Sequence, residues 1–175
     1  MSRFKLRFNK AMIPELANRY RDPGDDKILR KIGPRAKSRG YFTKEDFQDL
    51  CGWKTPRSQR WVGKNSAELI EEATRIALST ACEEIRIGVL TVLNGVSWPT
   101  ASAVLHIAHE DPYPILDVRA LWSLGIDNRP NFYTFDYWWD YTQFCRELAN
   151  SCQVSMRTLD RALWQYSKEN QPKLN

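Results

Sequence analysis

The sequence predicts an all-α protein with two helical lobes. Apolar residues recur at the three- and four-residue spacing of helices through nearly the whole chain, and alternating β-branched runs are almost absent. Residues suited to capping precede several of these apolar stretches. The length of 175 residues is enough for one sizeable core that two lobes can share.

The N-terminal part is expected to begin with two short helices and a basic loop. A helix over 10–21 ends at the turn-forming sequence DPGDD, and a second helix over 25–32 ends at Gly33 and Pro34. The following segment PRAKSRG (34–40) is basic and turn-rich, which favours a loop or a surface arm.

Capping residues indicate where the later helices begin. Thr43 precedes the helix TKEDFQDLCGW, with Asp46 at the position that completes a capping box. Residues 54–65 carry several cations and a tryptophan without clear periodicity, and Asn65 or Ser66 is expected to cap the next helix. The remaining helices are expected over 65–78, 81–93, 98–109, 117–124, 135–150 and 155–169.

Charge is distributed unevenly along the chain. The net charge is +5, but residues 1–64 hold 17 Lys and Arg against 7 Asp and Glu, whereas residues 65–175 hold 9 against 14. A polyanionic partner would be steered towards the N-terminal third. The alternative is a basic surface that only meets solvent.

The hydropathy of the chain does not indicate a membrane protein. No window approaches the run of about 18 apolar residues that a membrane span needs. The N-terminus is basic but has neither a long apolar segment nor a small-residue cleavage site, and acidic residues arrive early for a transit peptide. We therefore expect a cytoplasmic monomer with no membrane partner.

The stretch LNGVSWPTASAVL (93–105) predicts two helices joined by a tight turn. Gly95 can leave the first helix with a positive φ. Ser97 can cap the second helix, and Pro99 in its first turn forfeits an amide that has no helical partner. The free amides of the loop would then point outward together, which suits a DNA phosphate. The DNA-binding residues expected here are Asn94, Gly95, Val96, Ser97, Trp98 and Thr100.

The pattern LxxLNGVSxxTAxxxL (90–105) resembles the helix-hairpin-helix motif of the endonuclease III-like DNA glycosylase superfamily, which usually reads LxxLPGVGxxTAxxxL. In that family an aspartate follows the hairpin. Here YPILD supplies Asp117, 22 positions after Gly95, a spacing similar to that of the adenine-glycosylase branch. Asn94 and Ser97 depart from the usual proline and glycine, which should alter the turn little.

The resemblance implies two lobes with a cleft between them and an enzyme that removes a base from DNA. Pro99 stands where bifunctional members carry a Schiff-base lysine, so the resemblance implies a monofunctional hydrolase that leaves an abasic site. Cys145 and Cys152 match the first spacing of the family's iron–sulfur loop, but Ser155 and Arg161 stand at the other two ligand positions. We therefore expect buried or half-buried thiols, no metal and no cofactor.

Asp117 is the predicted catalytic residue. Hydrolysis of an N-glycosidic bond builds positive charge on the deoxyribose, and a nearby carboxylate can stabilise that charge or activate water. One aspartate suffices once the target base has been flipped out of the duplex. The alternative is an ordinary N-cap of the helix over 117–124, and a capping carboxylate can serve both purposes because it is held in place.

A flipped base needs flat walls and polar edges, which residues 47–61 can supply. The expected pocket residues are Trp53, Trp61 and Tyr113, and the expected cationic contacts to DNA are Lys54, Arg57 and Arg60. The alternative is a pair of core tryptophans with solvent-facing basic neighbours. In the aromatic run 131–141, helical spacing favours a core stripe, with a tyrosine left to face a pocket; the stripe consists of Phe135, Trp138 and Trp139, and the tyrosine is Tyr137 or Tyr141.

The predicted lobes comprise residues 1–42 with 126–175, and residues 43–125 with the hairpin (90–109) and the aspartate. The predicted function is that of a monofunctional DNA glycosylase acting on double-stranded DNA with a damaged or modified base, in repair or in defence against modified phage DNA. One alternative is a non-catalytic helix-hairpin-helix DNA-binding protein. Another is a helical scaffold whose basic arm binds an acidic protein.

Overall fold

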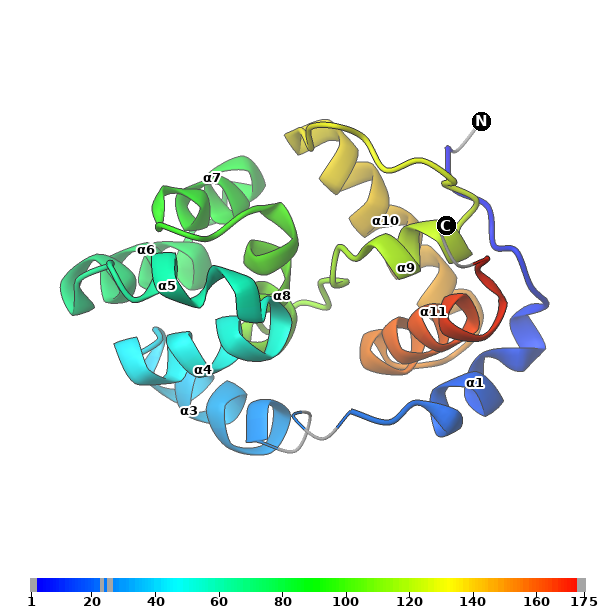
Figure 1. The fold of residues 1–175 in the computed structure, drawn as a ribbon, viewed down its shortest axis with the longest axis horizontal. Helices are drawn as coiled ribbons and strands as arrows, with labels where there is room; N and C mark the ends of the chain where they lie inside the picture. Colours follow the sequence, from blue (N-terminus) through cyan, green and yellow to red (C-terminus); the bar gives the residue numbers. More distant parts are fainter. Residues whose placement is uncertain (1–2, 23, 25–26, 173–175) are drawn as a thin grey trace. The chain divides into compact units, whose positions relative to one another are not determined.

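A computed structural model describes residues 3–22, 24 and 27–172 of the chain. These residues form helices and connecting segments, with no β-strand among them (Figure 1). The all-α prediction is therefore confirmed. The chain divides into two compact units, one of residues 1–21 with 112–175 and one of residues 22–111, here named the terminal unit and the hairpin unit. No helix of the described segments is long and apolar enough to span a bilayer.

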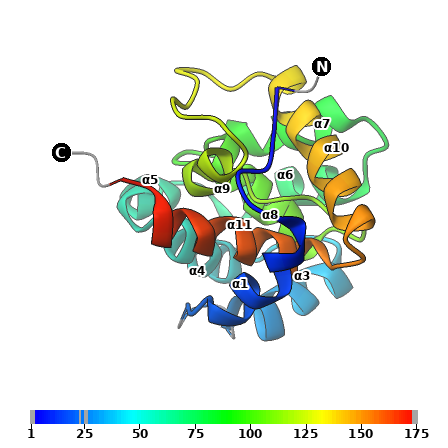
Figure 2. The same cartoon turned by 90° about the vertical axis from the view of Figure 1, so that its right-hand side faces the viewer.

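The terminal unit is built around its last helix. Its helices are η1 (Lys10–Met12), α1 (Ile13–Arg19), α9 (Val118–Ser123), α10 (Phe135–Ser151) and α11 (Met156–Asn170). Helix α11 packs against α1, α9 and α10, and Figures 1 and 2 show α1 alongside it. Leu159 and Leu163 of α11 and Ile13 and Leu16 of α1 are at most 1% exposed. Burial of each such side chain contributes about 1.5–3 kcal/mol.

Residues 112–125 belong to the terminal unit, whereas the sequence placed them in the lobe of the hairpin. Hydrogen bonds explain the difference. The N–H of Lys5 donates to the carbonyl of Leu124 (2.9 Å), and the Ser123 hydroxyl donates to the carbonyl of Leu163 (2.6 Å). The N-terminal segment and α11 thus hold α9 by long-range hydrogen bonds, which local sequence patterns do not predict.

Helix α10 buries a different face from the one expected. Trp138 is fully buried as predicted, but Phe135 and Trp139 are only half-buried. Tyr137 and Tyr141 are buried in their place, and the ring of Phe4 meets both of them edge-on at centroid distances of 5.6 and 5.7 Å. The predicted stripe is therefore wrong in two of its three members, because the N-terminal segment covers the tyrosine face.

The hairpin unit surrounds the buried helix α8 (Trp98–Ala108). The elements that precede it are η2 (Ile28–Ile32), α3 (Gly33–Arg39), α4 (Lys44–Lys54), η3 (Pro56–Ser58), α5 (Gln59–Val62), α6 (Ala67–Ser79), α7 (Glu83–Gly88) and η4 (Val89–Val92). Helices α3, α4, α6 and α7 all contact α8. Residues 100–105 of α8 are buried on every side, as expected for a helix that is apolar all round.

Residues 34–40 were predicted as a loop or arm, and this prediction is wrong, because α3 occupies them up to Arg39. The preceding turn η2 is π-helical, with the N–H of Gly33 donating to the carbonyl of Ile28. This wider turn accommodates Pro34, whose ring clashes with the carbonyl four residues earlier in a regular helix. Part of the helix expected over 25–32 lies outside the described residues.

The close packing of α3 on α8 explains why residues 22–42 lie in the hairpin unit and not with the chain ends. A Cβ atom added to Gly33 would lie 2.8 Å from both Cγ2 and the carbonyl oxygen of Ile107. Ile32 and Ala36 are fully buried beside it. Gly33 therefore marks a helix contact, where the sequence suggested a helix end.

Capping largely follows the sequence. The hydroxyl of Thr43 accepts from the N–H of Asp46 (3.3 Å), and Ser66 caps α6 by accepting from Leu69 (3.2 Å). Asp46 was expected to complete a capping box. Its carboxylate, only 3% exposed, instead binds Arg35 and Arg39, because a buried charge needs an opposite charge beside it.

We expect Gly33→Ala to lower the free energy of unfolding by about 1–3 kcal/mol, because the new methyl group must displace the backbone of α8. Gly88→Ala is the matched control. Gly88 has helical dihedral angles, and an added Cβ would meet no atom within 4 Å. This variant should be stabilised by about 0.5–1 kcal/mol. Urea denaturation followed by circular dichroism measures both; equal effects would contradict the close contact.

Acid should weaken the terminal unit through one ion pair. Arg19 of α1 donates to both carboxylate oxygens of Glu169 in α11, at 3.0 and 2.7 Å. These hydrogen bonds, helped by one from Gln165, lower the pKa of Glu169 from 4.5 to about 2. A carboxyl whose pKa is lower in the folded state stabilises the fold above its unfolded pKa. That contribution disappears as the pH falls from about 4.5 to 2.

The test compares the pH dependence of unfolding in Glu169→Gln with the parent protein. The variant should lose less stability between pH 4.5 and 2, the interval bounded by the two pKa values. Glu147→Gln is the control, because Glu147 is exposed and forms no ion pair within the described segments. An unaltered acid limb in Glu169→Gln would show that this pair does not govern acid sensitivity.

Candidate active site and nucleic-acid interface

The turn between η4 and α8 has the conformation that the sequence predicts. Gly95 has a φ of +79°, and the N–H of Val96 donates to the carbonyl of Leu93 (3.1 Å). A Cβ at Gly95 would lie 3.0 Å from the Cβ of Trp61 and from the backbone nitrogen of Val62. Glycine is therefore required here both for the left-handed backbone and for the space beside α5.

A buried asparagine fixes this turn. Asn65 is 1% exposed, and its Oδ1 accepts from the N–H of Asn94 (2.8 Å). Its Nδ2 donates to the carbonyls of Asn94 (3.0 Å) and Val62 (2.9 Å). Asn65 was considered only as a helix cap, and the sequence offers no signal for this role, because its partner lies 29 positions away.

The outward amides of the loop are fewer than expected. Those of Asn94 and Val96 bond within the fold, and the Ser97 side chain does not cap α8, in contrast to the prediction. Among the described residues, no backbone group accepts from the N–H of Gly95, Ser97 or Thr100. These three amides are the donors that the turn can offer to an anion.

The side chains of the predicted hairpin residues divide into two groups. Asn94 and Ser97 are exposed and Trp98 is half-buried at the start of α8. Val96 and Thr100 are 8% and 1% exposed, and the Thr100 hydroxyl lies 3.3 Å from that of Thr55. The side chains of Val96 and Thr100 are therefore not available to DNA, and of the two residues only Thr100 has a backbone N–H left for such a contact.

Cations gather beside the turn around one tryptophan. Trp61 is 44% exposed, with the guanidinium of Arg60 4.9 Å and the ammonium of Lys64 4.3 Å from its ring centre. The Cβ of Trp61 lies close to Gly95, so the tryptophan that carries these cations adjoins the turn. Lys64 was not among the predicted contacts, because it follows the end of α5 and residues 54–65 show no periodicity that would place it beside Trp61.

The other predicted contacts of this segment are spread over the hairpin unit. Arg57 is exposed on η3, and Lys54 is half-buried at the end of α4. The hydroxyl contact of Thr55 with α8 joins this segment to the hairpin helix. Trp53, predicted to line a base pocket with Trp61, is half-buried, and its Nε1 donates to Asp22 (3.0 Å).

Tyr113 was predicted to line the base pocket, and the structure corrects this. It is fully buried in the terminal unit, where its ring stacks on Trp138 with an interplanar angle of 9°. The guanidinium of Arg146 lies 4.6 Å from its ring centre. Tyr113 is therefore a core residue, because apolar and cationic neighbours take up its ring faces.

Asp117 begins α9 and lies in the terminal unit. Its Oδ1 accepts from the N–H of Arg119 (2.8 Å), so the N-cap interpretation is confirmed. Its side chain is half-buried. The carboxylate thus has a fixed orientation at the start of a helix, where a negative charge is stabilised.

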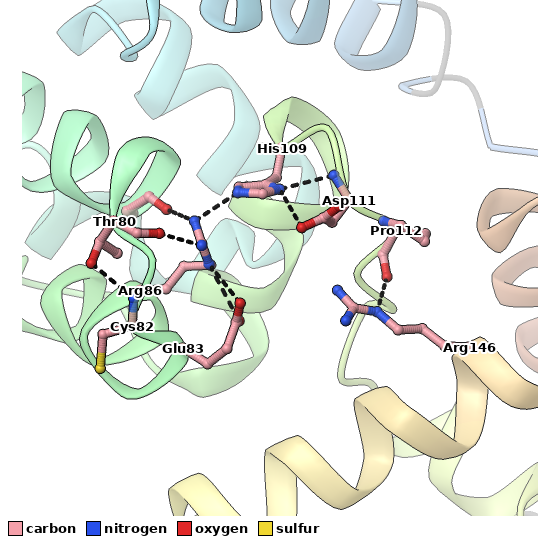
Figure 3. A network of polar contacts seen from close by, with 9 residues as sticks. Thr80, Cys82, Glu83, Arg86, His109, Asp111, Pro112 and Arg146 are labelled. Carbon is pink, nitrogen blue, oxygen red and sulfur yellow. Dashed lines mark hydrogen bonds and ion pairs between the residues drawn. The ribbon is translucent and has the colours of Figure 1, made fainter.

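Helix α10 holds the irregular segment that leads into Asp117. Arg146 Nε donates to the carbonyl of Pro112 (2.9 Å; Figure 3), and the Tyr141 hydroxyl donates to the carbonyl of Ile115 (2.8 Å). Ile115 and Leu116 are buried. Arg146 and Tyr141 are positioning residues that sequence reasoning missed, because their bonds span 34 and 26 positions.

Two tyrosines lie within electrostatic range of Asp117. Burial raises the pKa of Tyr133, the negative charge of Asp117 adds to the rise, and Arg129 opposes it. Burial also holds the pKa of Tyr141 well above 10, with a further contribution from Asp117. Both hydroxyls therefore stay protonated, and that of Tyr141 donates its hydrogen to the carbonyl of Ile115.

His109, in the hairpin unit, has a structural role. His109 Nε2 lies 2.6 Å from Arg86 Nη1, and its Nδ1 accepts from the N–H of Asp111 (2.9 Å; Figure 3). Arg86 also donates to the carbonyl of Ala77 (2.8 Å) and to Glu83. In the part of the chain that the structure describes, no three His, Cys, Asp or Glu side chains group as metal ligands.

The thiols are arranged mostly as expected. Cys51 and Cys145 are buried, and burial raises the pKa of Cys51 to about 12. Cys152 is half-buried, whereas Cys82 is exposed, which the prediction of buried or half-buried thiols did not foresee.

Comparisons with known proteins give a match among solved structures. No family model and no curated protein matches the chain. Among solved structures, a match is the crystal structure of Methanocaldococcus jannaschii 8-oxoguanine glycosylase/lyase in complex with 15mer DNA containing 8-oxoguanine. The identity is 19%, the TM-score is 0.47, and the match covers 95% of this chain and 85% of that chain. The DNA and its modified base are properties of that complex.

The role of Asn65 leads to a stability prediction with a matched control. Asn65→Ala removes its bonds to both backbone groups of Asn94 and should lower the free energy of unfolding by about 1–3 kcal/mol. Asn94→Ala removes only the 3.2 Å side-chain contact with Asn65 and should cost well under half as much. Urea denaturation measures both changes. Hydrogen exchange at residue 94 should accelerate in Asn65→Ala alone; similar exchange in both variants would contradict the bracing role.

Proposed function

We propose that the protein is a DNA glycosylase that hydrolyses the N-glycosidic bond of a flipped base. The observation that carries the proposal is the turn at Gly95, with the free amides of Gly95, Ser97 and Thr100 and the cations around Trp61 beside it. Amides and cations together suit the phosphate backbone of DNA. This contact positions the enzyme without reading sequence.

Asp117 is the proposed catalytic carboxylate. As the bond between the sugar C1′ and the base breaks, its electron pair leaves with the base and positive charge develops on the sugar. The carboxylate stabilises that charge, and water adds to C1′ while its proton passes to solvent or to the departing base. The hydrogen bond from Arg119 and the anchoring of residues 112–116 on α10 support this role, because a fixed carboxylate needs little reorganisation.

The finer features of the proposal come from the sequence. Pro99 in place of a lysine supports a monofunctional enzyme that leaves an abasic site, and no step requires a metal or cofactor. The proposed partner is double-stranded DNA with a damaged or modified base, acted on by a cytoplasmic monomer in repair or in defence against modified phage DNA.

A second candidate function is a DNA-binding protein without catalysis. The N-cap of α9 favours it, since Asp117 then has a structural use that involves no reaction. An experiment that keeps the cap and removes the charge separates the two candidates.

We expect Asp117→Asn to lose at least about 100-fold in base excision, because asparagine caps helices nearly as well as aspartate but carries no charge. The substrates are duplexes with oxidised, alkylated, deaminated or mispaired bases, together with modified phage DNA, and the readout is abasic-site formation. Duplex affinity and unfolding should stay unchanged. Asp136→Asn, an exposed carboxylate in the first turn of α10, should retain activity.

Equal excision by Asp117→Asn and the parent would refute the catalytic role, and duplex binding without excision on any substrate would favour the second candidate. Strand breaks should appear only after alkaline treatment. A protein–DNA adduct trapped by borohydride would contradict the monofunctional assignment, since that adduct requires an amine nucleophile.

A further inference from the structure

One face of α11 carries cations alternating with an aromatic ring. Arg157, Arg161, Trp164 and Lys168 follow each other at spacings of four, three and four residues, which places them on one side of the helix. At 1.5 Å per residue this row extends about 16 Å, comparable to five nucleotides at 3.4 Å per step along a DNA strand. We name this row, together with Arg119 of α9, the α11 stripe.

Aromatic rings hold the cations of the stripe in place. Arg119 and Lys168 lie 5.1 and 5.2 Å from the ring centre of Trp164. Arg157 and Arg161 lie 5.4 and 5.7 Å from the ring centre of Tyr20, which meets Trp164 edge-on. Stacking of this kind orders long side chains, and of these four cations Lys168 is exposed and Arg119 is half-buried.

Two cations of the stripe, Arg119 and Lys168, differ from most cations of η2 and α3 in having no acidic partner among the described residues. Asp160 pairs with Arg157, but neither Arg119 nor Lys168 forms an ion pair with any described residue. On η2 and α3, by contrast, Asp46, Asp49 and Glu110 pair with Arg35, Arg39, Lys27 and Lys37. The basic N-terminal third, for which the sequence leaves both an anion-binding region and a solvent-facing surface open, is thus partly neutralised within the fold.

We propose that the α11 stripe binds the sugar–phosphate backbone of DNA as a contact of the terminal unit. The inference rests on the proposed function, because it takes the reacting sugar to lie at Asp117. Arg119 donates its backbone N–H to that carboxylate, and its side chain begins the stripe. A strand presented to Asp117 therefore has its neighbouring phosphates within reach of Arg119 and then Lys168. Trp61, with Arg60 and Lys64, repeats the same combination of residues beside the hairpin turn.

The test measures affinity for a short undamaged DNA duplex across salt concentrations in Arg119→Gln, Lys168→Gln and the double variant. Each lost phosphate contact should reduce the slope of log affinity against log salt by about 0.9, so the loss of affinity between about 50 and 200 mM salt shrinks roughly 3.5-fold per cation. The Lys5→Gln and Lys10→Gln double variant is the matched control. These exposed lysines line a groove against α10 in the same unit, and their removal changes the net charge equally.

A second measurement locates the contact directly. Acetylation of lysines followed by mass spectrometry should show Lys168 protected by duplex DNA and Lys5 unprotected. An unchanged slope in the folded double variant, an equal change in the control, or unprotected Lys168 would each overturn the inference. A reduced slope without base excision on any substrate would support the stripe as a DNA contact and refute the proposed enzyme. Base excision with an unchanged slope would support the proposed enzyme and refute the stripe as a DNA contact.

Discussion

The backbone of the hairpin turn depends on a single buried side-chain amide. Asn65 satisfies both backbone polar groups of Asn94, so the chain can bend sharply without leaving them unpaired. Once these groups are engaged, the amides of Gly95, Ser97 and Thr100 are the ones left for an anion. The cations around Trp61 follow from the same arrangement, because α5 ends at Val62, whose carbonyl Asn65 also binds. One side chain thus couples the shape of the turn to the charge beside it.

The terminal unit also orients Asp117 through hydrogen bonds from side chains to the backbone. Two side chains of α10, Arg146 and Tyr141, bind carbonyls of the segment that precedes the aspartate, and α9 receives its carboxylate as a cap. In both units a side chain distant in sequence satisfies backbone groups of an irregular segment. Such segments are costly to bury without partners. The result is a defined geometry in regions that have no regular secondary structure of their own.

Local features of this fold could be predicted from sequence, and long-range ones could not. Thr43, Gly95 and Asp117 act through neighbours within a few residues, so their capping and turn conformations follow from residue type. Asn65 and Tyr141 act through partners 29 and 26 positions away, which a single sequence does not encode in any readable pattern. Residues 34–40 show the same limit: their composition favours a turn, but packing of Gly33 on Ile107 makes them helical. The sequence thus predicted residues of the candidate site, such as Gly95 and Asp117, but not the distant residues that hold them in place.

The order of the chain through the two units has a consequence for biosynthesis. The hairpin unit is a continuous insertion, residues 22–111, within a terminal unit whose two parts flank it. A nascent chain emerging from the ribosome carries every residue of the insertion long before α11 is made. Helix α1, with Ile13 and Leu16 facing α11, must therefore wait without its partner until translation is nearly finished. Premature termination would release a chain whose first helix has an apolar face and nothing to cover it.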